Sequence, residues 1–184
     1  MEPIKQKTTA VGRRIVWLAL ALVLVGIDQW TKYLITEHFA LGETKALIPG
    51  VLHLSYVRNT GAAFGILQNH RWVFMVLSSI AIIGVFVCLW VFARRCALFC
   101  TALAMIAGGG IGNMIDRCRL GYVTDFIDLR FIDFAVFNAA DSFVCIGCAL
   151  LLFYLLFFDA RTAEPLFCTR EKRAADDNNG DGIQ

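Results

Sequence analysis

The sequence is poor in charge, proline and histidine. Only 17% of its 184 residues are charged, and it contains three prolines and three histidines. Hydrophobic residues make up 58%, whereas a soluble domain has about 45–50% apolar and about 25% charged residues. The net charge of +2 is too balanced to indicate a nucleic-acid partner. The excess of apolar residues predicts an integral membrane protein.

Several motifs of catalysis and cofactor binding are also absent. His38, His53 and His70 are isolated from one another, so no cluster has the ligand spacing of a zinc site. There is no GxSxG motif and no Walker-type phosphate loop. We therefore expect neither a metal nor a cofactor. The seven cysteines are odd in number and scattered, unlike a disulfide framework.

Four apolar segments are long enough to cross a bilayer core, which takes about 20 helical residues. They lie at about residues 15–34, 72–93, 96–115 and 138–158. The first ends in polar residues without a small-x-small cleavage site, so we expect an uncleaved anchor. The predicted organisation is a cytoplasmic tail (1–14), a membrane domain (15–158) with outer loops at about 35–71 and 116–137, and a disordered cytoplasmic tail (159–184).

Basic residues predict the orientation of these segments. They precede the first segment, fill the joint between the second and third, and follow the fourth; these are Lys5, Lys7, Arg13, Arg14, Arg94, Arg95, Arg161, Arg170, Lys172 and Arg173. Because basic flanks stay on the cytoplasmic side, we expect both termini inside and the two longer loops outside.

The first outer loop contains a strand pattern. From Val51 to Arg58, apolar residues alternate with His53, Ser55 and Val57, and the turn signal Asn59-Thr60-Gly61 follows. We expect a small sheet on the outer membrane surface.

Acidic residues gather at the outer ends of the apolar segments: Asp28, Asp116, Asp125 and Asp141. Placing an aspartate at the centre of a membrane-spanning helix costs about 2.5–3.5 kcal/mol of insertion free energy. Acidic residues in or near such segments therefore indicate a specific role. In GGGIGNMIDR (108–117) the glycines allow another helix to approach closely. On a helix Asn113, Asp116 and Arg117 share one face. The simplest interpretation of that face is a packing patch that ends in an Asp–Arg pair.

The segment FNAADS (137–142) has two interpretations. Asn138 is well placed as a helix N-cap, with Asp141 completing a capping box. Alternatively, Asp141 and Asp125 form a pair of carboxylates that share a proton, one acting as base and the other as acid on a water molecule. Asp128 and Asp133 are competing candidates in an ordinary loop.

Five blocks in order resemble one family: DQWTK (28–32), NTGAAFG (59–65), GGGIGNMIDR, GYVTDFIDL (121–129) and FNAADS. The chain is similar to bacterial prolipoprotein signal peptidases, the type II signal peptidases, from about Ile15 to Phe158. The resemblance implies an all-α inner-membrane protein with four transmembrane helices, a small extracytoplasmic β-cradle and a short outer helix over the active site.

The resemblance also implies a reaction and its residues. The reaction is hydrolysis on the amino side of a diacylglyceryl-modified cysteine, with an aspartyl dyad facing the outer surface and inhibition by globomycin. The dyad falls on Asp125 and Asp141. Supporting positions fall on Asp28, Lys32, Asn59, Gly61, Asn113, Asp116, Arg117 and Asn138.

Two departures and two alternatives accompany this interpretation. Tyr122 stands where the family often has histidine, and Ala135 where it usually has proline; both lie in the segment that leads to the dyad. A small transporter would place its acids at the midplane rather than at one surface. A thiol oxidoreductase would use the CxxC of Cys145 and Cys148, which lies inside an apolar segment.

Overall fold

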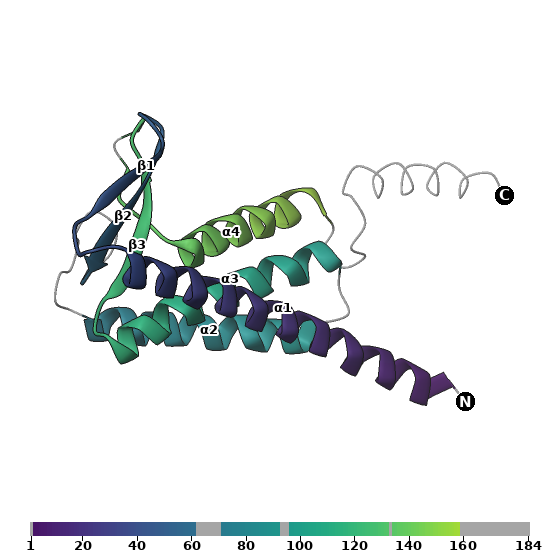
Figure 1. Cartoon of the computed structure of the whole chain (residues 1–184). Helices are drawn as coiled ribbons and strands as arrows, with labels where there is room; N and C mark the ends of the chain where they lie inside the picture. Colours follow the sequence, from purple (N-terminus) through teal and green to yellow (C-terminus); the bar gives the residue numbers. More distant parts are fainter. Residues whose placement is uncertain (1, 62–70, 93–95, 133, 159–184) are drawn as a thin grey trace, which may run out of the picture.

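The described part of the chain forms a bundle of four helices with a small sheet at one end. A computed structural model of the chain describes residues 2–61, 71–92, 96–132 and 134–158. Figure 1 shows the helices side by side, with the start of α1 at the end opposite to the sheet. The elements are α1 (Glu2–His38), β1 (Thr44–Ile48), β2 (Leu52–Asn59), α2 (Arg71–Phe92), α3 (Ala97–Arg119), β3 (Val123–Leu129) and α4 (Ala139–Phe157).

Three of the described helices are long and apolar enough to cross a membrane. They are α3, α4 and the part of α2 from Met75 to Phe92. α1 is continuous well beyond the predicted segment at both ends. Its apolar stretch is short, because only residues 15–27 separate Arg14 from Asp28. The fourth span therefore stays a prediction.

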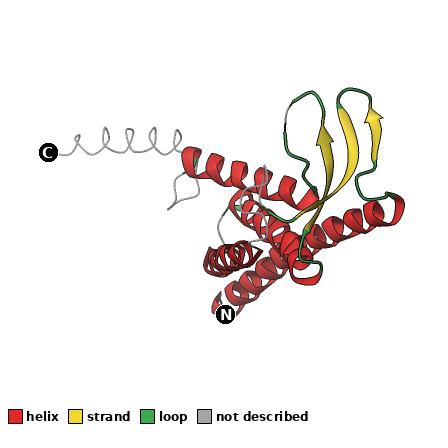
Figure 2. Ribbon diagram, turned by 90° about the vertical axis from the view of Figure 1, so that its left-hand side faces the viewer, coloured by secondary structure: helices red, strands yellow, loops and turns green. Residues whose placement is uncertain are grey.

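The sheet is antiparallel, in the order β1-β2-β3. The strand predicted over Val51–Arg58 is confirmed as β2. Figure 2 shows the sheet standing out from one end of the bundle. A buried cluster of Ile35, Tyr56 and Phe126 joins α1 to β2 and β3. This cluster fixes the strand that carries Asp125 against the helices. The segment 62–70, which includes the end of the NTGAAFG block, lies outside the described residues, and the described elements include no short outer helix.

The predicted close approach at the glycines of 108–112 is confirmed, and it involves three different helices. A Cβ added to Gly108 would meet the backbone of Ala21 in α1, and one added to Gly110 would meet Ile82 in α2. A Cβ on Gly109 would collide with the carbonyl oxygen of Ala140 in α4, and one on Gly112 with the Asp28 carboxylate. The absence of side chains here lets α3 pack against all three other helices.

We expect Gly109→Ala to lower the free energy of unfolding by about 1–3 kcal/mol, the usual cost of overpacking. The added methyl group would have to push the first turn of α4 away from α3, because the atom it meets is backbone. Gly84→Ala in α2 is the matched control, since nothing lies within 4 Å of its Cβ position. It should leave stability unchanged or raise it by up to about 1 kcal/mol. Unfolding in mixed detergent micelles measures both, and equal stabilities would contradict the packing argument.

Candidate active site

Asp125 and Asp141 lie in the same cavity. Asp125 is on β3, and Asp141 is in the first turn of α4. The cavity has a volume of about 450 Å³, and Asn59, Asn113 and Arg117 also line it. Asp125 is 2% exposed. The structure thus brings together the two carboxylates that the sequence paired, which are sixteen residues apart in the chain and lie on different elements.

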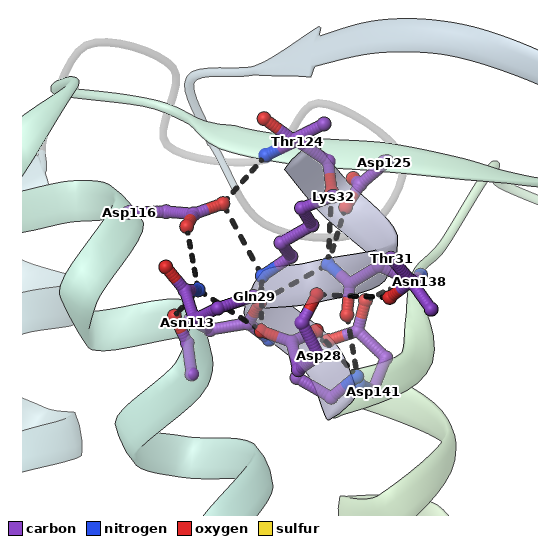
Figure 3. Close-up of polar contacts among 12 residues, drawn as sticks. Asp28, Gln29, Thr31, Lys32, Asn113, Asp116, Thr124, Asp125, Asn138 and Asp141 are labelled. Carbon is purple, nitrogen blue, oxygen red and sulfur yellow. Dashed lines mark hydrogen bonds and ion pairs between the residues drawn. The ribbon is translucent and has the colours of Figure 1, made fainter. Parts of the chain in front are cut away.

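Asn138 connects the two carboxylates directly. Its side-chain Nδ2 donates to Asp125 Oδ1 at 2.7 Å, and its backbone N–H donates to Asp141 Oδ2 at 3.2 Å. Asp125 receives a second amide hydrogen bond on Oδ2, from Asn59 Nδ2 at 2.8 Å. Figure 3 shows Asn138 between the carboxylates of β3 and α4. One fully buried residue therefore sets the relative position of both acids, through its side-chain amide and its backbone N–H.

Asp141 is also part of the capping box of α4. The Asn138 side chain accepts from the Asp141 backbone N–H at 3.0 Å, and the Asp141 side chain accepts from the Asn138 backbone N–H. The predicted N-cap is therefore confirmed. The Asp141 Oδ1 atom accepts from Asn113 Nδ2 at 2.7 Å. The two interpretations of Asp141 are compatible, because the same side chain caps the helix and lines the cavity.

Burial raises the pKa of Asp125 to about 7. The hydrogen bonds from Asn59 and Asn138 work against this rise, because they favour the ionised form, while the negative charge of Asp141 adds to it. Asp125 thus keeps its proton up to about neutral pH. A protonated acid beside a second carboxylate is the arrangement that general acid–base chemistry needs.

A buried lysine binds polar side chains next to the carboxylate pair. Lys32 Nζ lies 2.9 Å from Asp28 Oδ2, 3.2 Å from Asp116 Oδ2 and 2.9 Å from Asn113 Oδ1. These three acceptors match the three hydrogens of the ammonium group. Asn113 in turn donates to Asp141. The network in Figure 3 therefore links α1, α3 and α4 behind the carboxylate pair.

Two polar residues of this network were not singled out by the sequence analysis. The Gln29 side chain donates to Asp116 Oδ1 at 3.0 Å and to the carbonyl of Gly112 at 3.1 Å. The backbone N–H of Thr124 donates to Asp116 Oδ2 at 3.0 Å. The only signal for Gln29 is its place in the DQWTK block, and Thr124 contributes a backbone group that sequence does not reveal.

The other predicted residues lie in different parts of the structure. Asp28 belongs to the lysine network and accepts from the Ala140 backbone N–H at 2.9 Å. Gly61 closes the predicted turn by donating its backbone N–H to Asn59 Oδ1 at 2.9 Å. Asp128 is engaged elsewhere, with Ser55 at 2.7 Å and Arg130 at 2.8 Å. Asp133 lies outside the described residues.

The Asp116 carboxylate is bound by Lys32, Gln29 and Thr124, while Arg117 lines the cavity with the carboxylate pair. The proposed packing patch is therefore part of a larger polar network. Cys145, one turn after Asp141, also lines this cavity, and both Cys145 and Cys148 are exposed free thiols. Among the described residues, no group of three His, Cys, Asp or Glu side chains could hold a metal ion.

The fold is that of a membrane enzyme. Two solved structures titled as bacterial membrane enzymes, determined by the in meso method at 2.3 and 1.9 Å resolution, superpose with TM-scores of 0.71 and 0.67. Each is 34% identical to this chain, and the matches cover 77% of it and 87% and 92% of the solved chains.

The particular family follows from the sequence. The family described as Signal peptidase (SPase) II matches residues 20–157, and the chain belongs to it. The lipoprotein signal peptidase of Halalkalibacterium halodurans is 42% identical over 151 residues, which is 81% of this chain and 96% of that protein. The lipoprotein signal peptidase of Streptococcus pyogenes serotype M1 is 46% identical over 143 residues, covering 78% of this chain and 93% of that protein.

Proposed function

We propose that this protein is an aspartyl endopeptidase that removes the signal peptide of bacterial prolipoproteins, with Asp125 and Asp141 as its catalytic pair. Membership of the signal peptidase II family supports the reaction. The single observation that supports the pair is the bridge of Asn138 between both carboxylates in one cavity. The bond that is cleaved lies on the amino side of a diacylglyceryl-modified cysteine.

The proposed reaction needs only the two carboxyl groups and water. The N-terminus of α4 favours negative charge at Asp141, so Asp141 takes a proton from water as its oxygen attacks the carbonyl carbon. Asp125 gives its proton to the carbonyl oxygen, which produces a tetrahedral diol. As the C–N bond breaks, Asp141 protonates the leaving amine and Asp125 recovers its proton from the diol. The pair thus returns to its starting protonation.

The neighbouring amides act as positioning residues in this proposal. Asn59, Asn113 and Asn138 each donate to a carboxylate oxygen of the pair, which limits the rotation of both acids. Arg117 lines the cavity and is proposed to contact substrate there. Fixed dipoles of this kind reduce the reorganisation that the reaction requires.

The proposed location is the bacterial inner membrane, with four transmembrane helices. The basic flanks of the apolar segments support cytoplasmic termini. The sheet, whose strand β3 carries Asp125, and the first turn of α4, which carries Asp141, lie at the end of the bundle opposite to the start of α1 (Figure 1), and so would face the outer surface. A carboxylate pair near the outer bilayer surface suits a substrate whose two acyl chains hold its cysteine at that surface. Surrounding membrane lipids and the inhibitor globomycin are the further partners proposed.

The test is cleavage of a purified prolipoprotein, followed by the mobility shift on a gel. The wild-type chain should cut the diacylglyceryl-modified precursor and leave the same precursor without the lipid intact. Globomycin should block the cleavage. Failure to cut the lipidated precursor would contradict the proposed function, and equal cleavage of both precursors would contradict the proposed substrate.

The raised pKa of Asp125 predicts a fall in activity above neutral pH. Asp125 carries its proton below a pH of about 7 and loses it above, and the proposed reaction requires that proton. We therefore expect kcat/KM for the lipidated precursor to fall about tenfold per pH unit at pH values well above 7. A pH–rate profile measures this, with circular dichroism at each pH to verify folding. A flat profile up to pH 9 would exclude Asp125 as the acid.

A further inference from the structure

A second cavity opens between α1, α3 and β2. We call it the α1–α3 cavity; its volume is about 540 Å³. Thr124 of β3 lines it, whereas Val123 and Asp125 line the carboxylate cavity. Because neighbouring residues of a strand point to opposite faces, the two cavities lie on opposite faces of β3. The proposed reaction does not use this second cavity.

The α1–α3 cavity carries an excess of positive charge. Arg58 of β2, Arg119 at the end of α3 and Lys32 line it, together with the carboxylate of Asp116. Lys32 is paired with Asp116 at 3.2 Å and with Asp28 at 2.9 Å. The ion pairs among the described residues include neither Arg58 nor Arg119. Two guanidinium groups therefore remain to attract an anion.

Arg58 is held in place by two tyrosines that also line the cavity. Its Nε donates to Tyr56 Oη at 3.2 Å. Its guanidinium carbon lies 4.9 Å from the centroid of the Tyr122 ring and 5.8 Å from that of Tyr56. The Nη groups stay available, and they match the oxygens of a phosphate in a bidentate geometry. Because the side chain is already ordered, a ligand would lose little affinity by ordering it.

The surroundings of the cavity indicate where the anion comes from. Arg119 is the last residue of α3, one of the candidate membrane spans. Lipid phosphates lie just outside the hydrocarbon core that such a span crosses. Tyr33 of α1 lines the cavity and is 59% exposed. An exposed apolar stripe on α1, formed by Val23, Ile27 and Trp30, extends from this point along the bundle.

We propose that the α1–α3 cavity binds the phosphate group of an anionic phospholipid. Arg58 and Arg119 hold the phosphate, Tyr122 keeps Arg58 in position, and the acyl chains follow the exposed stripe on α1. The excess positive charge favours a headgroup with net negative charge over one that carries a choline. This inference does not depend on the catalytic roles of Asp125 and Asp141, and its test measures binding rather than cleavage.

The test uses the full chain in detergent micelles, titrated with short-chain phosphatidylglycerol, with phosphatidylcholine of the same chain length, or with inorganic phosphate. Phosphatidylglycerol should raise the midpoint of thermal unfolding, and the other two should have little effect. The double variant Arg58→Gln/Arg119→Gln should bind phosphatidylglycerol about 10- to 100-fold more weakly, the loss expected for hydrogen bonds to a charged group. Arg119→Gln alone, at an exposed helix end, should show part of this loss.

The double variant Lys45→Gln/Arg130→Gln is the matched control. It removes the same net charge from exposed positions outside the cavity, so it should bind phosphatidylglycerol like the wild type. An equal loss of phosphatidylglycerol affinity in both double variants would overturn the proposal, because it would mean that the lipid is attracted by net charge and not by this cavity. An equal rise of the unfolding midpoint with phosphatidylcholine would contradict the proposed site. An undiminished rise with phosphatidylglycerol in Arg58→Gln/Arg119→Gln would contradict it as well. A matching shift with inorganic phosphate would overturn the lipid as its ligand.

Discussion

Asp125→Asn and Asp141→Asn should each reduce cleavage of a lipidated prolipoprotein by about 10²–10⁴-fold, the usual contribution of a positioned acid or base. Each change keeps the size of the side chain and removes its ability to exchange a proton. Asn138 contacts both carboxylates, so the pair acts as a unit. The double variant should therefore be little worse than either single variant. Single-turnover cleavage by the purified variants measures these rates.

Asp128→Asn is the matched control for this experiment. Asp128 is also a buried carboxylate of β3, but its partners are Ser55 and Arg130 and it does not line the carboxylate cavity. This variant should cleave at a rate close to that of the wild type. If it loses activity while Asp125→Asn retains it, the assignment of the acid is wrong.

The sequence paired Asp125 with Asp141 because acidic residues gather at the outer ends of the apolar segments, and because the resemblance to the family places its dyad in the blocks GYVTDFIDL and FNAADS. Asp141 is three residues after Asn138, and this capping-box spacing favours a helix start. The alternation before Asn59 likewise predicts β2, since apolar faces of strands recur every second residue. Both patterns involve residues close together in the chain, so they can be recognised without knowledge of the fold.

The polar network around Lys32, next to the carboxylate pair, could not be predicted from such local patterns. The three ligands of Lys32 come from α1 and α3, and nothing in their spacing shows that these helices meet at this depth. The glycines of α3 indicated close packing, but they did not indicate that Gly109 faces α4 while Gly112 faces α1. Arg58 and Tyr122 are likewise distant in the chain, so their contact follows only from the pairing of β2 with β3.

Lys32→Met should lower the free energy of unfolding by about 3–5 kcal/mol, the cost of removing one partner from a buried ion pair. Lys32 is 4% exposed and Asp28 is fully buried, so water cannot replace the lost ammonium group. Asp28 and Asp116 would then face each other's charge without compensation. Unfolding in mixed detergent micelles measures the loss, with Lys45→Met as the control. The Lys45–Glu43 pair is exposed, and its removal should cost about 0–1 kcal/mol.

A second change separates the loss of charge balance from the loss of packing. If the cost of Lys32→Met arises from carboxylates left without a partner, then Asp28→Asn in the same chain should recover part of it. The amide oxygen of the asparagine can still accept from the Ala140 backbone N–H, which now bonds to Asp28 Oδ1. Asp28→Asn alone should destabilise the protein, so the two changes should be strongly non-additive. Additive losses would mean that the lysine stabilises the bundle through its aliphatic chain, and that its three polar contacts contribute little.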